Sequence, residues 1–295
     1  MAMEYKPSKL YEYIQNSELR TVNDGFKIRL SPELAKKYDA GVYANHIAHY
    51  AGYINEINAL GIKYPGRANP IFYMYIVPDE NCVELLSFPF PDAKSGGKPV
   101  SIYDLDGFNS AYGESQNIGE NAPAKEETIS RKVNSIHEFA HLVHGQFYRN
   151  SRILSEGFAE VLPLYTMNYE EKFDEHREVI KNMKAEDIIS PQELLAMEKD
   201  RSFGQKTRIP KKSCSFDWAY ISSYLFVRGY IMKVAEKFGL DRVQATQKFL
   251  EIVRSSQCSN EWLIFDLAEA IGVSGDELLE TKKLQLSAQE EIAKI

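Results

Sequence analysis

Residues 135–141, SIHEFAH, place two histidines four positions apart and a glutamate directly after the first histidine. The apolar residues around this HExxH motif recur at helical spacing and form one stripe: Ile129, Val133, Ile136, Ala140, Val143 and Phe147. Positions four apart on a helix differ by about 40° around its axis, so His137 and His141 can point at one metal ion. Glu138 would flank that ion, where a carboxylate can orient a water molecule and accept its proton. The segment therefore predicts a core helix that carries a metal-dependent hydrolytic site.

A third metal ligand is expected at Glu156, fifteen residues after His141. Two histidines and one glutamate leave a fourth position open for water, as catalytic zinc sites require. Glu156 lies in a second predicted helix that runs to about residue 162 and is interrupted by Pro163. Because Gly157 has no side chain, this helix is expected to approach the HExxH helix closely.

Neighbouring polar residues leave several interpretations open. Glu160, one turn after Glu156, either accepts a hydrogen bond from a ligand histidine or is a solvated surface acid. His144 lies about 20° from His137 around the helix. A histidine at such a position is more often packed, or hydrogen-bonded to a metal ligand, than itself a metal ligand. The less specific interpretation of His137 and His141 is a pair of structural histidines with hydrogen-bond partners.

Periodicity along the chain predicts an α+β fold. Strands are expected at 25–30, 71–77 and 100–103, and a long helix is expected from Ser31-Pro32 to Gly61. A long loop at 104–124 precedes a half that is almost wholly helical. In this half, Ser190 and Ser274 each fit a capping box, while Gly239 and Gly272 fit helix ends. The predicted units are an α/β lobe at 1–147 that ends in the HExxH helix and a helical lobe at 148–295 that carries Glu156.

The two segments HEFAH at 137–141 and SEGFAE at 155–160 resemble those of the gluzincin metallopeptidases, especially bacterial collagenase-like enzymes. The resemblance implies a zincin-like (thermolysin-like) two-lobe fold with an N-terminal mixed β-sheet. It also implies one zinc ion, held by His137, His141 and Glu156, and hydrolysis of peptide bonds by a metal-activated water. Glu138 would then be the general base. In the resembling enzymes a sheet edge binds the substrate as an added strand, which points to residues 100–103 or the loop after them.

A helix predicted over 216–238 offers Tyr220, Tyr224 and Tyr230 as donors to the oxyanion of the reaction. The resemblance singles out Tyr220, since related enzymes have a tyrosine six residues before a phenylalanine, here Phe226. For each tyrosine taken alone, packing in the core is the more common role.

Composition limits the partners and the environment. The chain has 35 Lys and Arg against 42 Asp and Glu, a net charge of -7, which disfavours nucleic acid as a partner. Three cysteines without CxxC spacing disfavour a disulfide framework and a thiolate zinc site. No transmembrane segment or export signal is evident, which favours the cytoplasm, or an extracellular location if a leader has been removed. The oligomeric state is open.

The predicted partner is a peptide or protein substrate. The predicted activity is that of an endopeptidase, because no aminopeptidase recognition motif is evident. Two alternatives stay open: a non-catalytic binding or regulatory module on a zincin scaffold, and a latent peptidase whose site is blocked by residues 104–124.

Overall fold

The structure is a computed structural model that describes part of the chain. It describes the backbone of residues 18–23, 26–30, 72–75 and 261–262, and both backbone and side chains at 52–53, 55–62, 129, 132–133, 136–137, 140, 143, 151–200, 202–203, 218–256 and 263–295. The chain divides into two compact units, Met1–Gln146 and Phe147–Ile295. The predicted strand at 100–103 and the loop at 104–124 lie outside the described residues.

The predicted α+β class is wrong for the chain as described. Among the residues whose side chains are described, 77% are helical and none lies in a strand. The described chain is mostly helical, so an α+β fold with an N-terminal mixed sheet does not represent it. The physical reason is the short length of the strands. Periodicity predicts a strand from an apolar run of only four to six residues, and such short strands account for a small share of the chain.

Three short strands are described in the N-terminal unit: β1 (Glu18–Asn23), β2 (Phe26–Leu30) and β3 (Phe72–Tyr75). β1 pairs antiparallel with β2, and β2 pairs parallel with β3. The strands expected at 25–30 and 71–77 are thus confirmed. β1 was not expected, although the Asp24-Gly25 dipeptide that joins it to β2 is a common hairpin signal.

Two helical stretches of the N-terminal unit contact each other. The first includes Tyr53, Glu56 and Ile57, and the second includes Lys132. The Lys132 ammonium donates to Glu56 Oε1 at 2.7 Å and lies over the ring of Tyr53, 5.3 Å from its centre. Ile57, the residue after Glu56, is fully buried.

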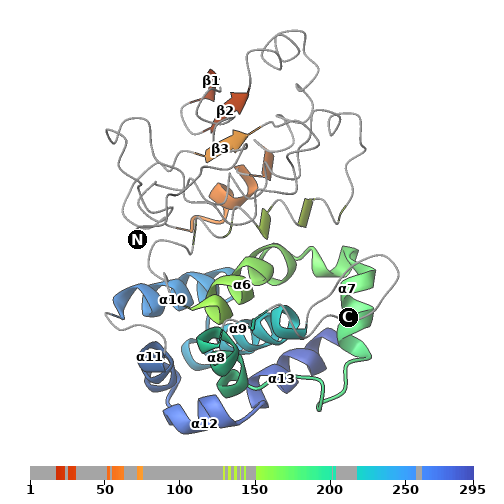
Figure 1. The fold of residues 1–295 in the computed structure, drawn as a ribbon, viewed down its shortest axis with the longest axis vertical. Helices are drawn as coiled ribbons and strands as arrows, with labels where there is room; N and C mark the ends of the chain where they lie inside the picture. The colour runs from red at the N-terminus through yellow and green to blue at the C-terminus, as the bar shows by residue number, and fades with distance from the viewer. Residues whose placement is uncertain are drawn as a thin grey trace, which may run out of the picture. The chain divides into compact units, whose positions relative to one another are not determined.

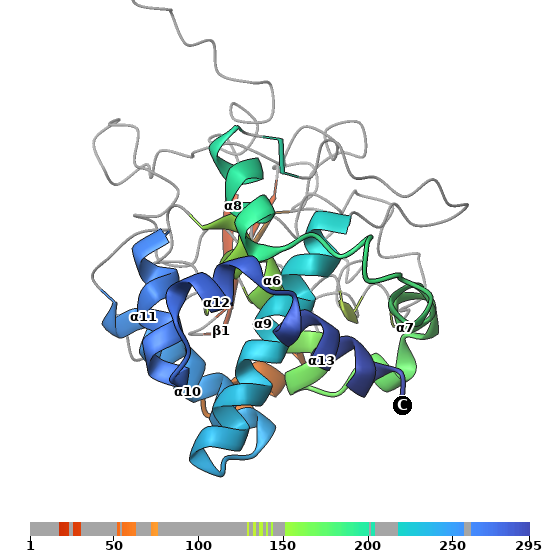
Figure 2. The same ribbon diagram turned by 90° about the horizontal axis from the view of Figure 1, so that it is seen from below.

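The C-terminal unit is a cluster of helices around α9 (Trp218–Phe238), as Figures 1 and 2 show. α9 contacts α6 (Arg152–Val161), α8 (Pro191–Lys199), α10 (Arg242–Ser255), α11 (Glu261–Ile271) and α13 (Lys283–Ile292). Two further helices, α7 (Asp174–Lys181) and α12 (Gly275–Glu280), pack against α13 and α11 respectively. Every residue from Ile221 to Ile231 is buried, so α9 is enclosed on all sides over this stretch.

The helix ends follow the local sequence. Ser190 accepts a hydrogen bond from the Glu193 backbone, and the Glu193 carboxylate accepts one from the Ser190 backbone, which confirms the predicted capping box of α8. Ser274 caps α12 as predicted, but the Glu277 carboxylate pairs with Lys283. Gly61, Gly239 and Gly272 all have a positive φ, as expected of residues that end helices.

Pro163 does not end the structure begun by α6. The chain continues from Val161 into a π-helical turn, η5 (Leu162–Thr166), in which Pro163 is an early residue and the Met167 amide donates to the Leu162 carbonyl. Proline fits the first turn of a helical segment because its missing N–H is not required there. The prediction of a helix to about residue 162 that is interrupted at Pro163 is confirmed, because α6 ends at Val161 and a π-helical turn follows it.

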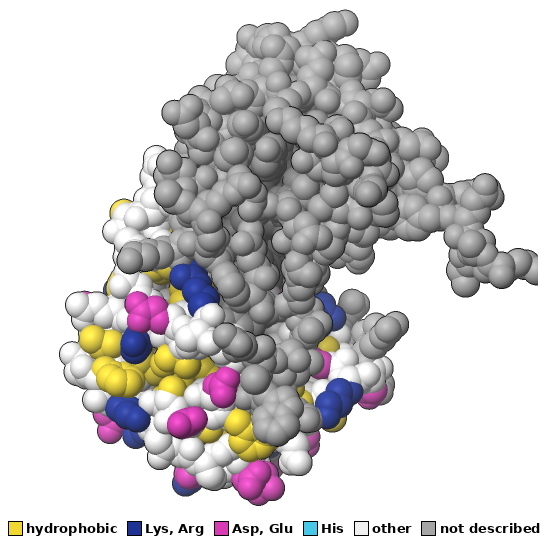
Figure 3. Space-filling view, turned by 90° about the vertical axis from the view of Figure 1, so that its left-hand side faces the viewer, with side chains coloured by type: hydrophobic (Ala, Val, Ile, Leu, Met, Phe, Trp, Pro, Cys, Tyr) yellow, Lys and Arg dark blue, Asp and Glu magenta, His cyan; other side chains and the backbone are white. Residues whose placement is uncertain are grey.

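On the face of the C-terminal unit seen in Figure 3, basic, acidic and hydrophobic side chains are interspersed. Among the residues of this unit whose side chains are described, three large hydrophobic ones are exposed: Phe238, Phe265 and Ile295. None of the helices that the structure describes is long and apolar enough to cross a bilayer.

Candidate functional site

The HExxH segment is helical at each position that the structure describes. Ile136, His137 and Ala140 are helical, as are neighbouring positions 129, 132–133 and 143. The predicted stripe is buried at the described residues Val133, Ile136, Ala140 and Val143. His137 is half-buried, which fits a position at the edge of the buried stripe. Glu138, His141 and His144 lie outside the described residues.

Glu156 and Glu160 lie on the less buried side of α6. Both are half-buried, whereas Gly157, Phe158 and Val161 are buried on the side that packs in the core. The helix begins at the N-cap Ser151, whose hydroxyl oxygen accepts a hydrogen bond from the Leu154 amide. The two carboxylates are one turn apart and about 40° apart around the axis, so they share a face of the helix.

Gly157 serves a different contact from the one expected. A Cβ at this position would lie 2.5 Å from the Ser223 carbonyl oxygen and 2.6 Å from Val227 Cγ2, both on α9. The glycine therefore lets α6 approach α9 within the C-terminal unit. The predicted approach to the HExxH helix stays a prediction.

A chain of contacts links Glu156 with Tyr220 within the C-terminal unit. Glu156 Oε1 lies 3.8 Å from an Arg152 guanidinium nitrogen, and this guanidinium lies over the Phe203 ring, 5.4 Å from its centre. The Phe203 ring packs against the Tyr220 ring at 5.5 Å between centres. Tyr220 is half-buried at the first turn of α9. These contacts define one patch of four residues: Arg152, Glu156, Phe203 and Tyr220. The patch includes a predicted ligand, Glu156, and a predicted oxyanion donor, Tyr220, which are 64 positions apart in the sequence.

The hydroxyls of the other two tyrosines of α9 are engaged in the core. Tyr224 is fully buried and donates to Glu170 Oε1 at 2.7 Å. Tyr230 is also fully buried and donates to the Leu267 carbonyl at 2.8 Å. Burial raises the pKa of both phenols above the ordinary value, so both stay protonated. Of the three tyrosines offered by the sequence, Tyr220 has the least buried position.

The sequence analysis did not predict a buried cluster of charged residues around Arg228 of α9. The Arg228 guanidinium donates to the carboxylates of Glu170 and Glu291, and also to the Tyr224 hydroxyl. Glu170 and Arg228 are both almost completely buried, and burial lowers the pKa of Arg228 while Tyr224 and Glu170 together raise it above the ordinary value. The only sequence signal is that Tyr224 and Arg228 are four apart in an otherwise apolar helix, a spacing that allows them to interact.

Glu160 acts electrostatically on this cluster. Burial lowers the pKa of His176, while the charges of Glu160 and Glu170 oppose that effect. His176 is therefore neutral at pH 7, and its ring packs edge-on against Tyr224 at 5.3 Å between centres. The predicted supporting role of Glu160 toward a ligand histidine stays a prediction.

The predicted ligands belong to different units: His137 to the N-terminal unit and Glu156 to the C-terminal unit. Within the described part of the chain, no three His, Cys, Asp or Glu side chains gather in a group able to hold a metal ion. Comparison of the chain with protein-family models, with curated proteins and with solved structures finds no match.

Proposed function

We propose that this protein is a zinc-dependent peptidase, an endopeptidase that hydrolyses peptide bonds with an activated water molecule. The proposed zinc ligands are His137, His141 and Glu156, and the proposed general base is Glu138. The HExxH motif and a downstream glutamate on a separate helix carry the proposal. It depends on this local pattern of residues and not on an α+β zincin fold.

The donor types fit zinc, which binds imidazole nitrogen and carboxylate oxygen and leaves a position open for water in catalytic sites. His137 and Glu156 are both half-buried on helices, so each can present a donor atom at a surface of its unit. The 3.8 Å separation between Glu156 Oε1 and an Arg152 guanidinium nitrogen exceeds a hydrogen bond, so this ion pair is a weak one.

The observation that supports an enzyme most is the patch of Arg152, Glu156, Phe203 and Tyr220. It connects a carboxylate of the proposed site with a half-buried tyrosine through the Arg152 guanidinium and the Phe203 ring. A phenol hydroxyl that reached the scissile bond would donate to an oxyanion that develops during hydrolysis. A site devoted to structural metal would have no use for such a donor.

In the proposed mechanism, His137, His141 and Glu156 would hold the zinc ion, which would supply an acidified water and a Lewis acid for the scissile carbonyl. Glu138 accepts the proton of the attacking water and delivers it to the leaving amine. The Tyr220 hydroxyl donates a hydrogen bond to the oxyanion, and the Phe203 ring holds the phenol in position.

Turnover of a peptide library by wild type and Glu138→Gln tests the function. Because glutamine keeps the shape but cannot accept the proton, turnover should fall by about 100-fold to 10,000-fold while bound zinc stays the same. A variant with wild-type turnover would refute the proposed base. Activity that appears only after limited proteolysis would identify the latent form, and absence of activity in both states would favour a non-catalytic module.

Tyr220→Phe and Tyr224→Phe form a matched pair on α9. Loss of an oxyanion donor costs about 100-fold to 1,000-fold in kcat, so Tyr220→Phe should lower kcat with little change in KM. Tyr224→Phe should instead lower thermal stability, because it removes the hydroxyl hydrogen bond to buried Glu170. Equal kcat values for wild type and Tyr220→Phe would remove this tyrosine from the mechanism.

A further inference from the structure

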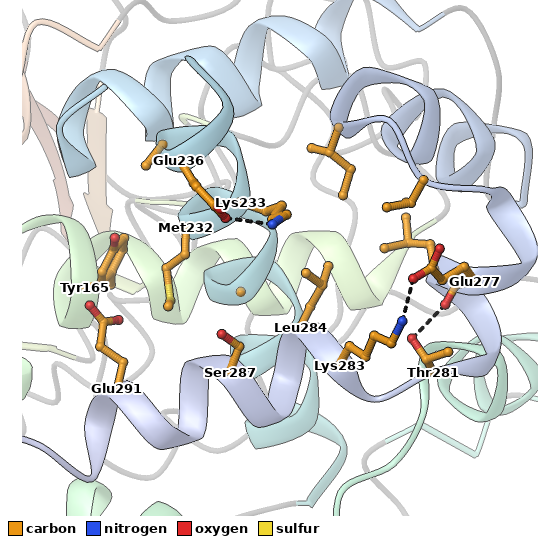
Figure 4. A pocket seen from close by; sticks show the side chains of 15 residues that line it. Tyr165, Met232, Lys233, Glu236, Glu277, Thr281, Lys283, Leu284, Ser287 and Glu291 are labelled. Atoms are coloured by element: carbon orange, nitrogen blue, oxygen red, sulfur yellow. Dashed lines mark hydrogen bonds and ion pairs between the residues drawn. The ribbon is translucent and has the colours of Figure 1, made fainter. Parts of the chain in front are cut away.

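The C-terminal unit contains a pocket of about 700 Å³ that is separate from the proposed peptidase residues. It lies between α9, α12 and α13, with η5 at one end (Figure 4). This volume falls in the range of pockets that take small organic ligands. None of Arg152, Glu156, Phe203 or Tyr220 lines it.

The walls of the pocket are largely apolar. Met232 of α9 and Leu284 of α13 face it near its middle, and Ile271, Val273 and Leu278 line the end near α12. Gly229 also lines the pocket, at a point where a Cβ would collide with the backbone of Leu284. An apolar ligand body would therefore meet an apolar surface on several sides.

The charges of the pocket are unequal. Lys233 pairs with Glu236 at 2.6 Å and Lys283 pairs with Glu277 at 2.7 Å, so each of these pairs is neutral. A fifth charged residue, Glu291, depends on the Arg228 guanidinium, which already pairs with buried Glu170. Among the charged residues that line the pocket, Glu291 is thus the one carboxylate without a lysine partner. Arg228, whose guanidinium lies over the Tyr165 ring, and Arg242 offset part of its charge from outside the lining.

Two polar groups at that end have unused hydrogen-bonding capacity. Glu291 Oε2 accepts from Arg228 at 3.0 Å, but Glu291 Oε1 accepts no hydrogen bond from the described residues. The Tyr165 hydroxyl, from the π-helical turn, likewise has no hydrogen bond to them. Figure 4 shows Tyr165 and Glu291 side by side at one end of the pocket.

Local electrostatics favour a cation next to these two groups. Glu291 lies in the last turn of α13, where the helix dipole is negative and a cation is stabilising. Burial and the Glu291 charge raise the pKa of Tyr165, so the phenol stays protonated and its oxygen can accept a hydrogen bond. π-helical turns such as the one that presents Tyr165 occur often at functional sites.

We propose that this pocket binds a small amphipathic organic cation, with its ammonium group between Glu291 and Tyr165 and its apolar body against Met232 and Leu284. The ammonium would supply donors to Glu291 Oε1 and the Tyr165 oxygen, and would neutralise the carboxylate that shares Arg228 with Glu170. The site is independent of the proposed peptidase residues.

Isothermal titration of the full chain with tryptamine and with tryptophol tests this site, because the two probes differ only in ammonium against hydroxyl. Tryptamine should bind at least about tenfold more tightly, the value of one charge-assisted hydrogen bond. Its binding should shift the methyl resonance of Met232 among the seven methionines of the chain. Equal affinities, binding that leaves the Met232 signal unchanged, or absence of tryptamine binding at millimolar concentration would overturn the proposal.

Substitutions at Glu291 and Tyr165 test where the ammonium group of the ligand binds. Glu291→Gln should weaken tryptamine binding about tenfold, and Tyr165→Phe should weaken it by a smaller factor. The control is Glu290→Gln, which removes an exposed carboxylate from the same turn of α13 outside the pocket and should bind as wild type does. If Glu291→Gln fails to fold after losing its pair with Arg228, Tyr165→Phe decides: wild-type affinity in that variant would overturn the proposal.

Discussion

Glu198 of α8 should make the stability of the C-terminal unit depend on pH. Its Oε1 atom accepts a hydrogen bond of 2.6 Å from the Ile153 amide at the start of α6, the helix that carries Glu156. Its Oε2 atom is buried and has no hydrogen-bond partner among the described residues. Burial raises the pKa of Glu198 to about 7 from the ordinary 4.5, against the opposing effect of the helix amides.

The raised pKa of Glu198 determines the direction and the size of the change in stability with pH. A carboxyl with a raised pKa in the folded state contributes stability below pH 4.5 and loses that contribution as the pH rises to about 7. The full displacement corresponds to about 3 kcal/mol in the free energy of unfolding. Glu198→Gln keeps an oxygen that can accept from the Ile153 amide but cannot ionise. The stability of wild type relative to this variant should therefore fall by about 3 kcal/mol between pH 4.5 and pH 7.

Urea unfolding followed by circular dichroism at several pH values measures this difference. Glu193→Gln on the same helix is the control with the opposite sign, because hydrogen bonds from Ser190 lower the pKa of Glu193. The stability of wild type relative to Glu193→Gln should rise as the pH increases through the acidic range, since a lowered pKa stabilises the ionised form. A difference between wild type and Glu198→Gln that does not change with pH would refute the reasoning about burial.

Two further predictions concern packing and charge in the described part of the chain. Gly157→Ala should cost about 1–3 kcal/mol in unfolding free energy, because the new Cβ would meet the Ser223 carbonyl oxygen at 2.5 Å. The control, Gly52→Ala, should not destabilise the protein, because no atom lies within 4 Å of its Cβ. Thermal melts of both variants check this, and equal losses would contradict it. Glu170→Gln should cost about 3–5 kcal/mol, since it leaves the buried Arg228 charge poorly compensated, while exposed Glu171→Gln should stay near wild type in urea unfolding.

Local signals in the sequence predicted individual elements well. The apolar stripe from Val133 to Val143 is buried as its spacing requires, and the Ser190 capping box forms as its residues require. These features depend on neighbours within one or two turns, which a sequence displays directly. The strands at 25–30 and 71–77 follow the same logic.

Features that depend on distant residues were predicted poorly. The contact partner of Gly157 is Ser223, and no periodicity in α6 indicates which helix will pack there. Glu170 looks like one of many surface acids until α9 brings Arg228 and Tyr224 to it. The fold class failed in the same way, since the sum of short apolar runs does not show how much of the chain is helical.

The candidate site likewise contains residues that the sequence indicated and residues that it did not. The motif residues His137, Glu138, His141 and Glu156 could be chosen by type and spacing, because metal chemistry restricts both. Arg152 and Phe203, which connect Glu156 with Tyr220, carry no such signature. Only the structure brings these two residues to the patch.

Zinc stoichiometry of the full-length chain, by elemental analysis after dialysis, is the decisive measurement for wild type, Glu156→Gln and Glu160→Gln. The two variants change the same residue type one turn apart on one face of α6. We expect one zinc ion per chain in wild type and in Glu160→Gln, and a substantial loss in Glu156→Gln. A wild-type chain without zinc, or a Glu156→Gln variant that retains it with wild-type affinity, would contradict the proposed metal site.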